Sequence, residues 1–126
     1  MSVALYIRLS LADEETGFSK TESDSIVNQR MCLHNFLDND KVLVKLHRSE
    51  FVDDGYTATN GNRPSFTKML ELVQAGEIKT IIVRDFSRFF RDYIEAGNYL
   101  ECVFPFLGVR FISINDNYDS DDYKGS

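Results

Sequence analysis

Two kinds of apolar pattern alternate along the chain. Four short segments rich in strand-forming residues are predicted to be strands, at residues 3–9, 41–52, 80–83 and 109–114. The first, VALYIRL, is apolar almost throughout, which is typical of a strand buried on both faces of a parallel sheet. Between the strands, apolar residues recur at helical spacing over residues 21–37, 64–76 and 93–104.

Capping and breaking residues predict where these helices begin and end. Thr21 followed by Asp24 resembles a capping box, and Pro64 suits the first turn of a helix. Gly76 suits the C-terminal end of that same helix. Pro105 is expected to stop the third helix, because proline cannot continue regular helical hydrogen bonding.

The alternation of strands and helices predicts an α/β fold, with a mostly parallel central sheet and helices on both faces. In such sheets, chemistry collects at the carboxyl ends of the strands. Arg8 and Ser10 follow the first predicted strand, Asp53 follows the second, and residues 84–91 follow the third. We therefore expect these three segments to meet at one edge of the sheet.

The length of 126 residues suits one domain, which we place at residues 1–114. Residues 115–126 carry four Asp against one Lys and almost no apolar residues, so they are expected to form a flexible end that leads toward DNA-binding modules lying outside this chain. The sequence has no apolar run long enough to span a membrane and no signal-peptide pattern, which favours a cytosolic protein with no membrane partner.

Charge and cysteine content narrow the function further. A net charge of −6 argues that these residues alone hold DNA weakly, because binding by counterion release needs clustered Lys and Arg. Cys32 and Cys102 belong to no CxxC or Cys/His cluster, so we expect two free, buried thiols and neither a disulfide nor a metal site.

Several arginines and a serine could together break a phosphodiester bond. That reaction needs a nucleophile and cations that hold a phosphoryl group as its charge grows. Arginine suits the second task, because its planar fork donates two parallel hydrogen bonds to phosphate oxygens and stays charged. The candidate arginines are Arg8, Arg63, Arg84, Arg88 and Arg91.

Short motifs spread over almost the whole chain carry a family resemblance. They are YIRLS at 6–10, SIVNQ at 25–29, FVDDGY at 51–56, RPSF at 63–66, FSRFFRD at 86–92 and VRFISIND at 109–116. In that order they resemble the YxRxS, SIxNQ, VDDGY, RPxF, DLSRFGRD and VRFIAIND segments of the resolvase/invertase family of serine recombinases. The longer motifs are most similar to large serine recombinases of conjugative or mobilisable transposons.

The resemblance implies a resolvase-like catalytic domain whose site needs neither metal nor cofactor. Ser10 would attack the scissile phosphate and hold the 5′ end, while Arg8, Arg88 and Arg91 bind and neutralise the phosphate. The partners implied are double-stranded DNA and further copies of the protein, as a homodimer or tetramer. The full set of implied site residues is Ser10, Arg8, Arg88, Arg91, Gln29, Asp53 and Arg63.

Asp53 is available as a proton acceptor for Ser10, but a carboxylate among arginines should have a lowered pKa and be a weak base. We interpret Asp53 instead as a residue that orients an arginine. The group that accepts the proton of Ser10 is left open.

Two alternatives remain open at this point. One is an assembly module of the same fold that has lost its chemistry, since Phe90 and Ala58 stand where the family motifs have Gly. The other is a receiver-like, phosphate-binding signalling domain, which would need an acidic pair after the first strand. The chain has Arg8 at that place.

Overall fold

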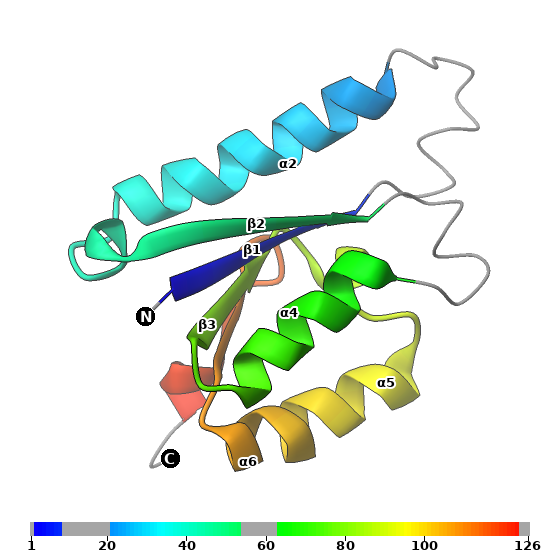
Figure 1. Cartoon of the computed structure of the whole chain (residues 1–126). Coiled ribbons are helices and arrows are strands. Elements are labelled where there is room, and N and C mark those ends of the chain that lie inside the picture. The colour runs from blue at the N-terminus through cyan, green and yellow to red at the C-terminus, as the bar shows by residue number, and fades with distance from the viewer. Residues whose placement is uncertain (1, 9–20, 54–62, 124–126) are drawn as a thin grey trace.

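A five-stranded sheet forms the centre of the computed structural model, which describes residues 2–8, 21–53 and 63–123 (Figure 1). The strands lie in the order β2-β1-β3-β4-β5, and β5 alone runs antiparallel to its neighbour. Their bounds are Ser2–Arg8 for β1, His47–Asp53 for β2, Ile78–Val83 for β3, Arg110–Ser113 for β4 and Tyr118–Asp119 for β5. The mostly parallel sheet predicted from the sequence is confirmed.

Helices cover both faces of the sheet, also as predicted. Helix α2 (Thr21–Asp38) lies alone on one face, and α4 (Pro64–Gln74) lies on the other with α5 (Tyr93–Asn98) and α6 (Phe104–Leu107) (Figure 1). Short 3₁₀ turns are η1 (Leu43–Lys45), η2 (Phe86–Arg88) and η4 (Ser120–Tyr123). Within the described ranges, none of the helices is long and apolar enough to cross a membrane.

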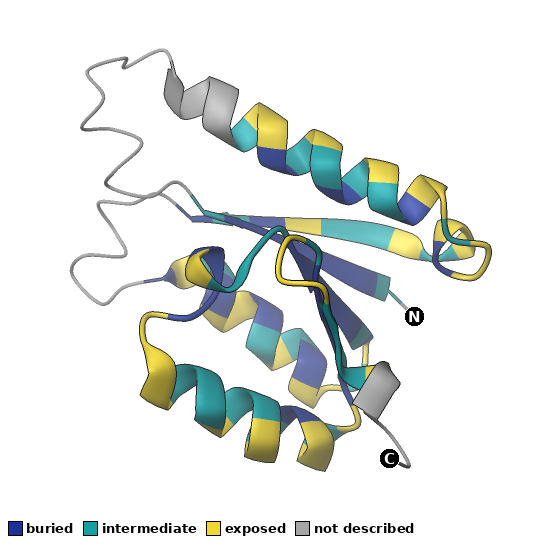
Figure 2. Ribbon diagram, turned by 180° about the vertical axis from the view of Figure 1, so that it is seen from behind, coloured by how far each residue is buried: buried dark blue, intermediate teal, exposed yellow. Residues whose placement is uncertain are grey.

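Strand β1 is buried on both faces, and its side chains alternate between two cores. Val3, Leu5 and Ile7 pack with residues of α2 in one cluster. Ala4 and Tyr6 pack in the second cluster, with residues of α4 and of the chain that follows β3. Seen from behind, buried residues concentrate on the strands and on the inward sides of the helices (Figure 2). This two-sided burial explains the near-continuous apolar run of the strand.

Helix α4 begins and ends as its sequence predicts. Pro64 occupies its first turn, and Phe66, Met69 and Val73 form its buried stripe. The chain leaves the helix through Gly76, whose φ of +83° is a left-handed conformation that suits glycine.

The strand predicted over residues 41–52 is wrong in its first half. Its first residues form a turn followed by η1, and β2 begins only at His47. The cause is Asp40, whose Oδ1 accepts hydrogen bonds from the backbone N–H groups of Val42 and Leu43, both at 2.9 Å. Such a local side-chain bond favours a turn over an extended strand.

Pro105 does not stop the third helix, which continues to Leu107. A π-helical turn, η3 (Tyr99–Val103), precedes it, and the N–H of Phe104 bonds to the carbonyl of Tyr99, five residues earlier. Pro105 then lies in the first turn of α6, where its missing N–H is tolerated. The helix ends instead at Gly108, with φ +71°.

The expectation of a flexible end is not met over residues 115–123, which form a turn, β5 and η4. Arg110 explains the difference, because its guanidinium donates to both carboxylate oxygens of Asp119, at 2.6 and 3.0 Å. This hydrogen bonding lowers the pKa of Asp119 below its ordinary value. Residues 124–126 lie outside the described part of the chain.

Both cysteines are free thiols, as expected, but they are not both buried. Cys32 is half-buried and Cys102 is exposed, because residue 102 faces outward in the π-helical turn. The expectation of burial was therefore wrong for Cys102 and is met only in part for Cys32.

Candidate active site

The carboxyl end of β1 is held from the side of α2. The backbone N–H of Arg8 donates to Gln29 Oε1 (3.2 Å), and Gln29 Nε2 donates to the carbonyl of Arg8 (3.0 Å). This is the pair of bonds that a neighbouring strand would supply, and Gln29 is fully buried. The side chain of Gln29 therefore fixes the backbone immediately before residues 9–20, which include Ser10 and lie outside the described residues.

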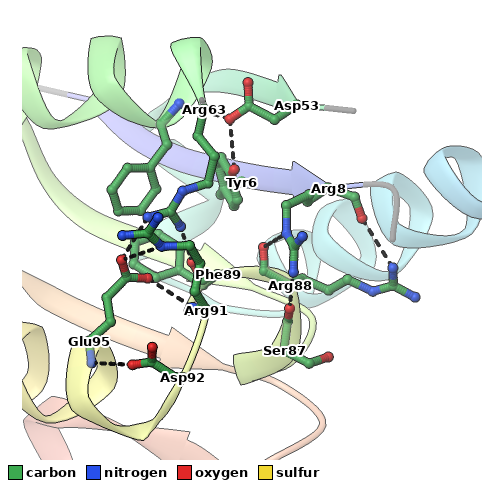
Figure 3. Close-up of polar contacts among 11 residues, drawn as sticks. Tyr6, Arg8, Asp53, Arg63, Ser87, Arg88, Phe89, Arg91, Asp92 and Glu95 are labelled. Atoms are coloured by element: carbon green, nitrogen blue, oxygen red, sulfur yellow. Dashed lines mark hydrogen bonds and ion pairs between the residues drawn. The ribbon is translucent and has the colours of Figure 1, made fainter. Parts of the chain in front are cut away.

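Arg8 and Arg88, 80 residues apart in sequence, lie side by side (Figure 3). Arg8 Nε donates to the carbonyl of Arg88 (3.3 Å), and Arg8 Nη2 donates to the carbonyl of Ser87. In return, Arg88 Nη1 donates to the carbonyl of Arg8 (3.2 Å). Each arginine thus holds the backbone of the other, and two cationic side chains meet at the end of β1.

Asp85 shapes the η2 turn that carries Arg88. Its Oδ1 accepts hydrogen bonds from the backbone N–H of Arg88 (3.2 Å) and the hydroxyl of Ser87 (2.6 Å). Burial opposes ionisation of Asp85, but the hydrogen bonds from Ser87 and Arg84 prevail, so its pKa lies below its ordinary value. An ionised cap therefore fixes the turn.

A second carboxylate fixes the other end of η2. Asp116, in the turn after β4, accepts hydrogen bonds at Oδ2 from the N–H of Phe86 and the hydroxyl of Ser113, both at 2.7 Å. Ser113 is fully buried at the end of β4. The turn that carries Arg88 is thereby joined to the fourth strand of the sheet.

Arg63 lies in the interior, although it was predicted to contribute to the phosphate site. Its side chain is 6% exposed, and it donates to the carbonyl of Phe89 (2.7 Å) and to Glu95 Oε2 (2.8 Å). Its guanidinium also lies 3.9 Å from the centre of the Phe66 ring, a cation–π contact. Arg63 therefore links the start of α4 to the segment that carries Arg91.

Arg91 is more accessible than the other arginines of the site, with 52% of its side chain exposed. Its backbone N–H donates to Glu95 Oε1 (2.9 Å) and its Nε donates to Glu95 Oε2 (3.1 Å) (Figure 3). Asp92 caps helix α5 by accepting from the N–H of Glu95 (2.8 Å). One carboxylate, Glu95, thus binds both Arg63 and Arg91.

Within the described residues, Asp53 forms no hydrogen bond or ion pair with an arginine, so its interpretation as an arginine-orienting residue was wrong. Its buried carboxylate accepts hydrogen bonds from the Tyr6 hydroxyl (2.7 Å) and from the N–H groups of Ser65 (2.9 Å) and Phe66 (3.0 Å). It satisfies the first turn of α4 and ties that turn to β1. Burial and the bond to Asp53 raise the pKa of Tyr6 far above its ordinary value, so Tyr6 stays protonated.

The environment of Arg8 favours an anion. Burial lowers the pKa of Arg8, and the nearby guanidinium groups of Arg63 and Arg88 lower it further. Among the described residues, no carboxylate forms an ion pair with Arg8, which donates to backbone carbonyls instead. In the same part of the chain, no His, Cys, Asp and Glu side chains group so that they could hold a metal ion. The site is therefore built from guanidinium groups.

Comparison with known proteins agrees with this arrangement. The family described as "Resolvase, N terminal domain" matches residues 3–126. The chain belongs to this family and is the catalytic domain of a serine recombinase. Among curated proteins, none is similar enough in sequence to be matched with this recombinase domain.

Solved structures share the fold of this recombinase domain. The N-terminal catalytic domain of TP901-1 integrase is 23% identical with a TM-score of 0.72, and the match covers 99% of this chain and 85% of that one. A resolvase family site-specific recombinase from Streptococcus pneumoniae is 23% identical with a TM-score of 0.71, covering 98% and 78%. A serine recombinase from Sulfolobus solfataricus is 26% identical with a TM-score of 0.65, covering 90% and 68%.

The recombinase domain brings five of its seven predicted site residues into two groups, while Asp53 bonds elsewhere and Ser10 lies outside the described residues. Gln29 and Arg88 meet at the backbone of Arg8, whereas Arg63 and Arg91 meet at Glu95. The receiver-like alternative is not favoured. A receiver-like domain would need an acidic pair after β1, whereas Arg8 and Arg88 lie at the carboxyl end of that strand.

Three supporting carboxylates, Asp85, Asp116 and Glu95, were missed by the sequence analysis. Each lies within four residues of a motif arginine or inside a motif, which is the signal that could have identified them.

Phe90, where the family motif has Gly, is accommodated by packing. It is 6% exposed and lies against Phe89 and Phe111, with ring centroids 4.8 and 5.5 Å apart. Asn117 is the one non-glycine residue with positive φ in the described ranges, so Phe90 adopts a backbone conformation open to any residue. The substitution adds to the aromatic core and leaves the Arg91 backbone unstrained.

Proposed function

We propose that this recombinase domain cleaves and rejoins double-stranded DNA through the hydroxyl of Ser10. The Ser10 hydroxyl gives up its proton, and its oxygen forms a bond to the scissile phosphorus as the bond to the 3′ oxygen breaks. The 5′ phosphate stays on the serine, and the 3′ oxygen leaves with a proton as a hydroxyl. Attack by a 3′ hydroxyl reverses these steps, and the phosphoserine bond conserves the energy for rejoining.

One observation carries this proposal: Arg8 and Arg88 meet at the carboxyl end of β1. Ser10 follows Arg8 by two residues, and two residues of chain span at most about 7 Å. A phosphate bound by these guanidinium groups would therefore lie within reach of the serine hydroxyl. Guanidinium groups at this place also stabilise the alkoxide that develops on the serine and the growing charge on the phosphate.

The remaining site residues divide into contact and support roles. Arg8, Arg88 and Arg91 bind and neutralise the phosphate. Gln29 holds the chain before the nucleophile, while Asp53 and Arg63 maintain the elements around the phosphate site. The contacts described above and the family to which the chain belongs support these roles.

The recombinase family binds DNA and acts as an oligomer, and we propose double-stranded recombination sites and a homodimer or tetramer as the partners. With a net charge of −6, these residues cannot attract the DNA backbone strongly. A DNA-binding module elsewhere in the full-length protein would supply most of the affinity.

Covalent-adduct formation tests the proposal. The full-length recombinase is mixed with a duplex that carries its recombination site and is labelled at a 3′ end, then resolved on a denaturing gel. We expect a labelled protein adduct and a partner fragment with a free 3′ hydroxyl. Ser10→Ala should abolish the adduct, and Ser49→Ala on β2 should leave it unchanged. An adduct that survives Ser10→Ala refutes the nucleophile assignment.

A further inference from the structure

A single carboxylate organises two of the site arginines. Glu95, in the first turn of α5, has a side chain that is 12% exposed and accepts hydrogen bonds from three donors. Two of these donors belong to Arg91, its backbone N–H and its Nε, and the third is Nη2 of Arg63. No sequence motif of the recombinase family singled out this residue.

A capping carboxylate and a buried arginine fix the position of Glu95. Its own N–H is held by Asp92, which begins the helix. Its carboxylate is held by Arg63, whose guanidinium is stacked on Phe66 and bonded to the carbonyl of Phe89. The guanidinium of Arg63 donates to these partners, and its side chain is only 6% exposed. Arg63 therefore anchors Glu95 and does not offer its guanidinium to a substrate.

We propose that Glu95 is the positioning residue for Arg91 in DNA cleavage, an inference that rests on the proposed function. By binding Nε and the backbone N–H, Glu95 leaves the outer edge of the Arg91 guanidinium, Nη1 and Nη2, to form two parallel bonds to a phosphate. Among the described residues, neither of these nitrogens has a hydrogen-bond partner, and the side chain is 52% exposed.

The charges of this group fit the same role. A carboxylate beside Arg91 alone would cancel its charge and weaken its attraction for phosphate. Arg63 prevents this, because the guanidinium cations of Arg63 and Arg91 outnumber the carboxylate of Glu95. These three side chains together carry one net positive charge. Glu95 thus fixes the direction of Arg91 while the group remains cationic.

A double-mutant cycle tests this inference. The rate of adduct formation is measured for wild type, Glu95→Gln, Arg91→Ala and the double variant of the full-length recombinase. The substrate is a recombination-site duplex nicked beside the cleavage position, which traps the adduct. We expect Glu95→Gln to slow the reaction tenfold or more, since misplacing a catalytic group by about 1 Å can cost roughly 100-fold. In the Arg91→Ala background the same change should cost less than about twofold.

A neutral substrate gives a readout that general damage to the fold would not change. When an uncharged methylphosphonate replaces the scissile phosphate, the charge of Arg91 matters less, so the penalty of Glu95→Gln should shrink to within about twofold. Glu101→Gln, at an exposed position of the π-helical turn η3 that follows α5, serves as the matched control and should react at the wild-type rate. If Glu95→Gln fails to fold, Glu95→Asp carries the same cycle, because it keeps the charge that Arg63 needs.

The outcomes separate this inference from the proposed function. Equal losses in both backgrounds, or an undiminished rate in Glu95→Gln, overturn the positioning role while the Ser10 adduct stands. An equal penalty on charged and neutral substrates overturns it as well. A wild-type protein that forms no adduct overturns both proposals.

Discussion

Replacing Asp53 by Asn tests the role that the structure gives to this buried carboxylate. Asp53 accepts from the Tyr6 hydroxyl, from Ser65 N–H and from Phe66 N–H. Asn has the same shape but one acceptor oxygen, with an amide that donates. Whichever way the amide turns, at least one N–H of the first turn of α4 faces another donor.

The expected cost follows from these contacts. A buried donor left without an acceptor costs about 1–3 kcal/mol. Removing a carboxylate from the positive end of a helix costs about 0.3–1 kcal/mol more. We therefore expect Asp53→Asn to lower the free energy of unfolding by about 1.3–4 kcal/mol. Asp38→Asn, which weakens only a surface ion pair with Arg48, should cost less than about 1 kcal/mol.

Urea denaturation of the 126-residue chain at neutral pH, followed by far-ultraviolet circular dichroism, measures both values. The midpoint should fall for Asp53→Asn with little change in the denaturant slope. If Asp53→Asn were as stable as Asp38→Asn while the full-length protein lost adduct formation, the reasoning would be refuted. Asp53 would then act in the chemistry and not in support of α4.

Two further predictions concern the end of β1. Gln29→Met removes both hydrogen bonds to the Arg8 backbone, so adduct formation should slow tenfold or more. The control Gln74→Met, at an exposed position, should leave the rate unchanged. Equal rates for the two variants would contradict the role of Gln29 in holding the Arg8 backbone. Tyr6 has a raised pKa in the folded state, so the stability that its protonated hydroxyl contributes is fully present below about pH 10. This contribution to the free energy of unfolding is lost as the pH rises further. Between pH 10 and 11.5, wild type should lose up to about 1.4 kcal/mol per pH unit more than Tyr6→Phe in denaturation experiments, and equal slopes would contradict the assignment.

The sheet was predictable from the sequence because burial on both faces leaves little room for polar residues. Val3, Leu5 and Ile7 face one core while Ala4 and Tyr6 face the other, so the strand is apolar from residue 3 to residue 7. The same reasoning failed at residues 41–46, where apolar residues are equally frequent. There the side chain of Asp40 bonds to the local backbone and produces a turn, an effect that apolar periodicity does not register.

The types of residue in the site were predictable, but their pairing was not. Arginines after a strand indicate an anion site, and Arg8 does meet Arg88. That Arg63 is buried against Glu95, 32 residues away, depends on how α4 and α5 pack, which local sequence does not encode. The pair Arg91–Glu95 has the spacing of an ordinary exposed helical ion pair, so its connection to the interior was not visible.

The π-helical turn at Tyr99–Val103 has a consequence for strand β4. In a regular α-helix, residues five apart point about 140° away from one another, yet the rings of Tyr99 and Phe104 lie 5.3 Å apart. The wide turn acts as one surplus residue, and it lets Phe104 stack on Phe111 of β4, at 5.4 Å. Deleting a single residue here would rotate everything downstream by about 100° and turn Phe104 away from the strand. The packing of β4 against α6 thus depends on the one extra residue in the π-helical turn.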